Sequence, residues 1–257
     1  MSGYCSPASA RRRARNRAAR SRAPCPRGGI PGGPPQPFNV TPTYANVAYA
    51  SASPTEKLDI YLPSGAGPHP TVIFFHPGAF MFGDKTDIPD SVGKALLKNG
   101  YAIVGVNYRL SGEAKFPAAV QDGKAAVRFL RANAATYDLD PNNFVAWGES
   151  AGGNIAALIG VGSGVSYFDD PSLGNPGVSS RVRAVIDQYG PTDFGLMDEQ
   201  AKAQGCPASD QTHNSANSPE SLYLGAPLPT VPNLVKESDP ITYVDRSPTS
   251  IRRIRPS

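Results

Sequence analysis

The chain has 257 residues, a net charge of +4 and a sequence pI of about 9.0. This length suits one sizeable α/β domain and is short for two. Twelve arginines lie in the acid-free segments 1–30 and 246–257, so residues 31–245 carry a net charge of −8. An acidic body without a recognition motif argues against a nucleic-acid partner.

Residues 1–36 are rich in Arg, Pro and Gly, and we expect them to form a disordered head. No apolar run follows their positive charge, so no signal peptide is read, and a cytoplasmic location is slightly favoured. No run of eighteen apolar residues predicts a membrane span. The three cysteines, Cys5, Cys25 and Cys206, are too far apart to indicate a disulfide framework or a metal site.

Strand and helix patterns alternate from about residue 38 onward. Continuous apolar runs such as 71–75 (TVIFF) and 101–106 (YAIVGV) indicate strands that are buried on both faces, as in a parallel sheet. The predicted strands cover 46–50, 57–62, 71–75, 101–106, 143–147 and 182–189, and the predicted helices cover 90–99, 117–135 and 154–160. This alternation predicts an α/β fold with a doubly wound, mostly parallel sheet.

Residues 191–240 have a different texture, because Pro, Ser, Asn and Asp are frequent and only 193–204 and 218–224 look weakly helical. We expect a cap-like excursion over the edge of the sheet. The next strand-like run is 241–244. The predicted boundaries are a head at 1–36, a domain at 37–247 and a tail at 248–257.

The residues 148–152 (GESAG) match the pattern G-x-S-x-G between a predicted strand and a predicted helix. So tight a turn needs glycine where the chains approach closely, and it strains the serine. The motif therefore predicts that Ser150 is a nucleophile whose hydroxyl lies above the sheet.

A second motif, 76–80 (HPGAF), directly follows the strand TVIFF. The small residues Gly78 and Ala79 allow backbone N–H groups to turn inward. Together with the N–H of Ala151, these groups can hold the oxyanion of a tetrahedral intermediate. The two motifs in this order are much more specific than either one alone.

These motifs resemble those of the α/β-hydrolase superfamily. The segment 76–80 is similar to the HGGGF or HGGAF motif of hormone-sensitive-lipase-like esterases and of bacterial and fungal carboxylesterases, including BD-FAE-like, feruloyl-esterase-like and acetyl-esterase groups. The segments 106–110 (VNYRL), 116–130 and 144–154 resemble the strand, helix and nucleophile turn of those families. The resemblance covers about residues 40–247.

Position by position, the resemblance implies Ser150 as the nucleophile and Gly78, Ala79 and Ala151 as the oxyanion donors. Pro77 departs from the usual glycine, but the donors fall on the next two positions, so the missing N–H of proline need not be costly. We interpret His76 as a residue that fixes the loop.

The order of such a triad places an acid and then a histidine after the serine. Only His213 follows Ser150, in a polar, turn-like segment, and order alone also permits Asp193 as the acid. In the family, strands that carry the acid and the base follow a segment like 239–247. We therefore expect that both residues, and the C-terminal strands that hold them, are missing from this sequence, through a frameshift or a real truncation.

The favoured function is hydrolysis of a small-molecule carboxylic ester through an acyl-serine intermediate, without a metal or an organic cofactor. Phe80 and Met81 are expected to line a substrate pocket, although ordinary loop packing explains them equally well. A serine peptidase or amidase on the same fold is the first alternative. The second is a catalytically inactive hydrolase that acts as a binding protein. The oligomeric state cannot be read.

Overall fold

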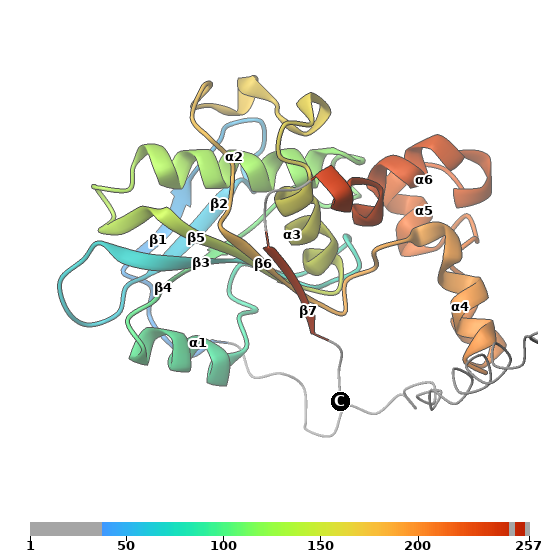
Figure 1. Cartoon of the computed structure of the whole chain (residues 1–257), viewed down its shortest axis with the longest axis horizontal. Helices are drawn as coiled ribbons and strands as arrows, with labels where there is room; N and C mark the ends of the chain where they lie inside the picture. Colours follow the sequence, from blue (N-terminus) through green and yellow to red (C-terminus); the bar gives the residue numbers. More distant parts are fainter. Residues whose placement is uncertain (1–37, 247–249, 255–257) are drawn as a thin grey trace, which may run out of the picture.

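The computed structural model describes residues 38–246 and 250–254 (Figure 1). Its seven-stranded sheet has the order β1-β2-β4-β3-β5-β6-β7. At one edge, β1 pairs antiparallel with β2 and β2 pairs antiparallel with β4, whereas β4, β3, β5, β6 and β7 run parallel to one another. The strands are β1 (Tyr44–Ala48), β2 (Lys57–Tyr61), β3 (His69–Phe75), β4 (Ala102–Val106), β5 (Leu139–Glu149), β6 (Ala184–Gln188) and β7 (Ser250–Ile254). The mostly parallel α/β sheet predicted from the sequence is confirmed.

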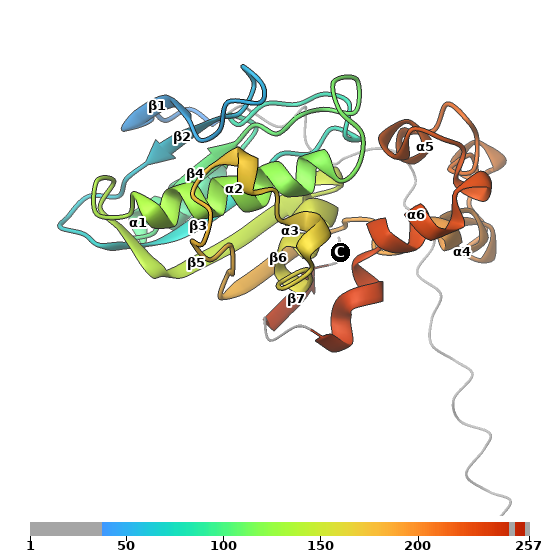
Figure 2. The same cartoon turned by 90° about the horizontal axis from the view of Figure 1, so that it is seen from above.

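Helices cover both faces of this sheet (Figures 1 and 2). One face carries α1 (Asp90–Lys98), and the other carries α2 (Ala118–Ala132) and α3 (Ala151–Val161). Successive side chains of β3 point to opposite faces, so Val72 and Phe74 belong to one core cluster, and Ile73 and Phe75 to the other. The run TVIFF is continuously apolar because both faces of the strand are buried.

The predicted excursion after β6 contains three α-helices at one end of the molecule: α4 (Met197–Ala203), α5 (Pro219–Leu224) and α6 (Pro232–Ser238). The prediction of a strand at 241–244 is wrong, because these residues lie in the 3-10 helix η6 (Pro240–Arg246). Tyr243 is buried while Ile241 and Val244 are exposed. Exposed residues three positions apart fit a helix. The sequence resembles a strand because three of the four residues at 241–244 are β-branched.

Strand β7, which pairs with β6 in parallel, lies in a segment where the sequence predicted no strand. The predicted head at 1–36 lies outside the described residues. No helix in 38–246 or 250–254 has both the length and the apolar character that a membrane span requires.

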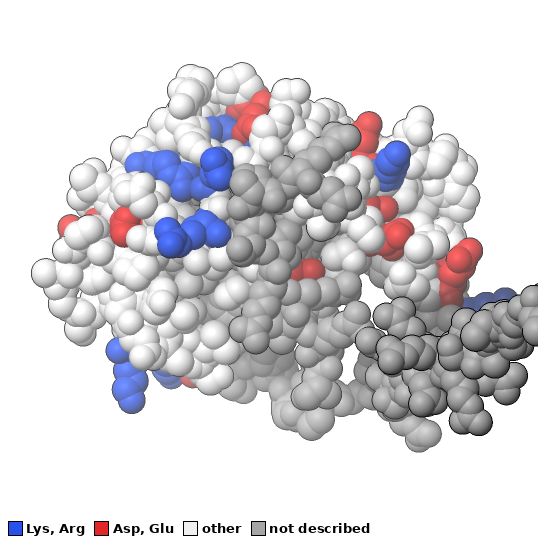
Figure 3. All heavy atoms as spheres, viewed as in Figure 1, with Lys and Arg blue, Asp and Glu red and all other residues white. Residues whose placement is uncertain are grey.

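Charged side chains are sparse on the face shown in Figure 3. Most acidic groups on this face lie over the region of α4, α5 and α6, and most basic groups lie over the opposite half. No charge of a single sign forms a continuous stripe over the described surface in this view.

Candidate functional site

Ser150 lies at the turn between β5 and α3, at the carboxyl edge of the parallel strands. Its backbone has φ 52° and ψ −120°, a region that non-glycine residues rarely occupy. The Ser150 N–H donates to the Gln188 carbonyl at 3.0 Å, which ties the turn to the end of β6. Within the described residues, no side chain forms a hydrogen bond with the Ser150 hydroxyl.

The glycines on both sides of Ser150 are required because neighbouring atoms leave no room for a Cβ. A Cβ on Gly148 would lie 2.0 Å from the Gly152 carbonyl oxygen, and a Cβ on Gly153 would lie 2.5 Å from Asp187 Oδ1. These separations are far below van der Waals contact. The glycine pattern thus encodes the tight strand-to-helix turn that the sequence predicted.

The segment 76–82 after β3 forms a compact loop, here called the oxyanion loop. Gly78, Ala79 and Phe80 have φ values of 126°, 54° and 61°, and the Met81 N–H donates to the Gly78 carbonyl at 2.8 Å. In the part of the chain that the structure describes, the N–H groups of Gly78 and Ala79 form no hydrogen bond. They are available as donors to a ligand.

The oxyanion loop and the serine turn are in direct contact. β3 and β5 are neighbouring strands, with Phe75 opposite Gly148. A Cβ on Gly152 would lie 2.0 Å from the Phe75 oxygen and 2.6 Å from the His76 oxygen. Ala151 begins α3, so its N–H is one of the helix donors that lack a partner within the helix. The structure thus brings together the elements that carry Ser150, Gly78, Ala79 and Ala151.

His76 lies beneath the oxyanion loop and is only 1% exposed. Its ring stacks on Tyr108 with centroids 4.3 Å apart, and its Nδ1 lies 2.8 Å from the Pro77 carbonyl oxygen. Burial lowers the pKa of His76, which favours the neutral ring with its proton on Nδ1. This geometry is that of a residue that fixes the loop.

The predicted pocket residues have different surroundings. Phe80 is 2% exposed and stacks on Tyr223 of α5 with ring centroids 3.9 Å apart. Met81 and Phe82 are 38% and 60% exposed. Phe80 therefore joins the oxyanion loop to the helices of the excursion, and Met81 and Phe82 are the apolar side chains of this loop that a ligand can reach.

Glu149 and Tyr189 form a polar pair beside the serine turn that the sequence did not reveal. The Tyr189 hydroxyl donates to Glu149 Oε2 at 2.8 Å. Burial raises the pKa of Glu149, while the hydrogen bond from Tyr189 opposes that rise. The pair links the ends of β5 and β6 a second time, beside the bond from Ser150 to Gln188.

Neither His213 nor Asp193, which chain order alone permits as base and acid, forms a hydrogen bond with Ser150 in the described part of the chain. The His213 Nδ1 lies 2.7 Å from Asp198 Oδ1, a partner that the sequence did not suggest. Asp193 caps the short helix η3 (Phe194–Leu196) by accepting from the Leu196 N–H. Order along the chain could not identify these local partners.

Among the described residues, no group of three or more His, Cys, Asp and Glu side chains has a metal-binding arrangement. A cavity of about 430 Å³ lies elsewhere, between Arg128 of α2 and the segment that precedes β6. Its walls include Asp169 and Arg181, and it contains none of the predicted site residues.

Known proteins are similar to this chain in sequence and in fold. The BD-FAE family model matches residues 58–252. The carboxylesterase NlhH of Mycobacterium tuberculosis is 40% identical over 91 residues, which are 35% of this chain and 28% of that protein. The match therefore spans less than a third of this curated relative.

Two solved structures are similar over most of the chain. A truncated form of a carbohydrate esterase from gut microbiota has a TM-score of 0.74 and 33% identity, over 85% of this chain and 79% of that one. A bifunctional GH43-CE protein of Bacteroides eggerthii has a TM-score of 0.71 and 34% identity, over 81% of this chain and 30% of that one.

Proposed function

Because the chain belongs to the BD-FAE family, we propose that it carries the nucleophile and the oxyanion hole of a serine hydrolase that cleaves carboxylic esters. The observation that carries this proposal is the strained Ser150 beside a loop with two unpaired N–H groups. A hydroxyl held at a strand-to-helix turn and donors beside it are the parts that acyl transfer needs.

In this proposal, Ser150 Oγ attacks the ester carbonyl, and a tetrahedral intermediate forms. Its oxyanion accepts hydrogen bonds from the N–H groups of Gly78, Ala79 and Ala151, and the dipole of α3 adds to their effect. The intermediate collapses with loss of the alcohol, and water then releases the acid from the acyl-serine. We assign no general base among the described residues.

The substrate class is an ester of a small molecule, and an acyl ester of a carbohydrate is the form we favour. Two structural relatives at 33% and 34% identity are described as a carbohydrate esterase and a bifunctional GH43-CE protein. The exposed Met81 and Phe82 offer apolar surface at the oxyanion loop, where an acyl group or the face of a sugar ring can pack.

A binding protein on the same fold is the second candidate, and it has one observation in its favour. No histidine in the described part of the chain forms a hydrogen bond with Ser150. Because the serine turn and the oxyanion loop keep their strained geometry, which costs stability, we favour the hydrolase.

The test is a comparison of p-nitrophenyl acetate with acetyl p-nitroanilide, using the wild type and Ser150→Ala. We expect ester cleavage above the Ser150→Ala background and no anilide cleavage. Anilide cleavage at a similar rate would favour the amidase alternative. Ester cleavage that equals the Ser150→Ala background would contradict the hydrolase proposal.

A further inference from the structure

The segment 107–111 follows β4 and contains most of the motif VNYRL, to which the sequence assigned no role beyond resemblance. In the structure it contacts both ends and the middle of the segment 76–85, which contains the oxyanion loop. These contacts involve residues more than twenty positions apart in the chain, so they concern the three-dimensional placement of the loop.

Tyr108 makes the contact at the start of the loop. Its ring stacks on His76 at an interplanar angle of 13°, and its hydroxyl donates to the His76 carbonyl at 2.9 Å. Tyr108 is 1% exposed, so this hydroxyl has no water to replace the carbonyl. The same His76 carbonyl is the one that packs against Gly152 in the serine turn.

Ser111 and Asn107 hold the middle and the end of the segment 76–85. The Ser111 N–H donates to the Phe80 carbonyl at 2.7 Å. The Asn107 side chain accepts from the Lys85 N–H at 2.5 Å and donates to Asp84 Oδ2 at 3.0 Å. The positive φ values of Ala79 and Phe80 lie between these fixed points, so the contacts hold a backbone that would otherwise relax.

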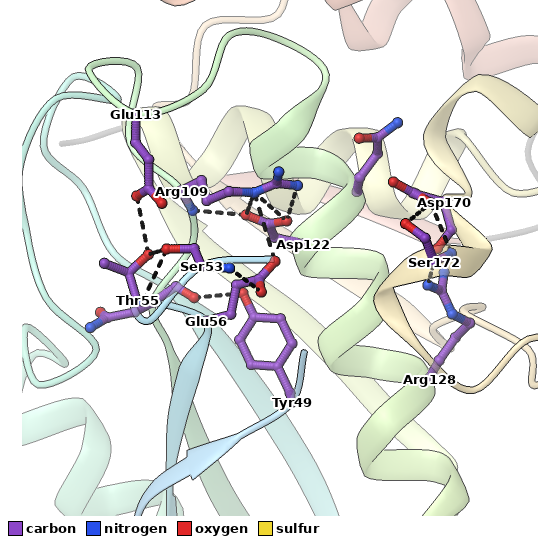
Figure 4. Close-up of polar contacts among 12 residues, drawn as sticks. Tyr49, Ser53, Thr55, Glu56, Arg109, Glu113, Asp122, Arg128, Asp170 and Ser172 are labelled. Atoms are coloured by element: carbon purple, nitrogen blue, oxygen red, sulfur yellow. Dashed lines mark hydrogen bonds and ion pairs between the residues drawn. The ribbon is translucent and has the colours of Figure 1, made fainter. Parts of the chain in front are cut away.

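The segment 107–111 is itself anchored on the body of the domain (Figure 4). The Arg109 guanidinium donates to both oxygens of Asp122 on α2, the shortest contact being 2.6 Å. Glu56 Oε1 lies 3.7 Å from Arg109 Nε, and the Tyr49 hydroxyl donates to the Asn107 carbonyl at 2.7 Å. Two-pronged ion pairs of this kind fix orientation as well as position.

We propose that the segment 107–111 positions the oxyanion hole, and that Tyr108 is its principal positioning residue. Through the His76 carbonyl, Tyr108 sets where the Gly78 and Ala79 N–H groups lie relative to Ser150. This inference rests on the proposed function, because an oxyanion hole is useful only to a reacting serine. Tyr108 itself does not contact the substrate.

The experiment compares Tyr108→Phe with the wild type in reaction with a p-nitrophenyl organophosphonate, whose phosphoryl oxygen occupies the oxyanion hole in the transition state. Tyr108→Phe keeps the ring that stacks on His76 and removes only the hydroxyl. We expect the maximal rate of phosphonylation to fall between about tenfold and a hundredfold, because misplaced catalytic groups cost that much. The concentration that gives half of that rate should stay within about twofold of the wild-type value, since ground-state binding is unchanged.

Tyr243→Phe is the matched control, because the Tyr243 hydroxyl also donates to a backbone carbonyl, that of Glu237, at 3.0 Å. It should lose similar thermal stability and keep the wild-type rate. Asn107→Ala removes a different anchor of the same segment, the contacts with Asp84 and Lys85. It should also lower the rate of phosphonylation. Equal rates in Tyr108→Phe and Tyr243→Phe, whether high or low, would overturn the positioning role. A wild type that does not react would instead contradict the proposed function.

Discussion

The backbone oxygen of Phe75 lies where a side chain on Gly152 would have to be, since a Cβ there would be 2.0 Å away. The end of β3 and the first turn of α3 therefore approach each other closely through main-chain atoms. This contact joins the strand before the oxyanion loop to the helix after Ser150. It explains why the fifth position of the G-x-S-x-G pattern is glycine here.

The first prediction tests this contact. Gly152→Ala should lower the free energy of unfolding by about 3 kcal/mol, because the rigid backbone around the new Cβ prevents relaxation. Gly112→Ala is the control, since a Cβ there would meet nothing within 4 Å and its φ is not in the left-handed region. Urea denaturation of both variants gives the comparison. Equal stability of the two variants would show that the chains do not approach as closely as described.

The second prediction concerns Asp239, which is 5% exposed and accepts from the Phe194 N–H at 2.8 Å. Burial raises the pKa of Asp239 to about 7, and the charge of Asp193 adds to the rise. The folded protein therefore holds this proton more tightly than the unfolded chain, whose Asp pKa is about 3.9. The contribution of Asp239 to the free energy of unfolding is therefore at its maximum below about pH 4. It is lost as the pH rises through 7.

Asp239→Asn keeps an oxygen that can accept from Phe194 and removes the titration. Between pH 5 and pH 8 the variant should gain about 2 kcal/mol of unfolding free energy relative to the wild type. The measurement is urea denaturation at both pH values, with the exposed Asp210→Asn as the control. A wild type and an Asp239→Asn variant with parallel pH profiles would rule out a raised pKa.

The third prediction concerns His213. Hydrogen bonds from His213 and Asn214 lower the pKa of Asp198, although burial works in the opposite direction. The His213 ring therefore holds the loop before α5 against α4. We expect His213→Ala to lose about 1–2 kcal/mol of stability and to keep the wild-type rate of phosphonylation. A collapse of that rate would identify His213 as the general base of Ser150.

Regular elements could be predicted from the sequence where burial on both faces leaves a clear pattern, as in the strand 71–75. The glycines around Ser150 predicted the turn because a neighbouring atom leaves no room for a side chain at each of these positions. The run 241–244 misled because β-branched residues resemble a strand even in a 3-10 helix, and the irregular segment 248–257 gave no hint of β7.

Parts of the site could not be predicted because they depend on contacts between distant residues. The Tyr108 hydroxyl reaches a carbonyl 32 positions away, and Tyr189 reaches Glu149 across two strands. Nothing in the local sequence of either residue encodes its partner. The motif VNYRL was visible, but only the fold shows that it lies against the oxyanion loop.

Covalent labelling shows directly whether Ser150 is the nucleophile. The wild type, Ser150→Ala and the control Ser163→Ala, which lies in the turn after α3, are treated with an organophosphonate, and the modified peptide is identified by mass spectrometry. We predict one phosphonate on Ser150 in the wild type and in Ser163→Ala, and none in Ser150→Ala, with similar thermal stability in all three. Labelling that persists in Ser150→Ala, or a wild type that remains unlabelled, would show that Ser150 is not the nucleophile.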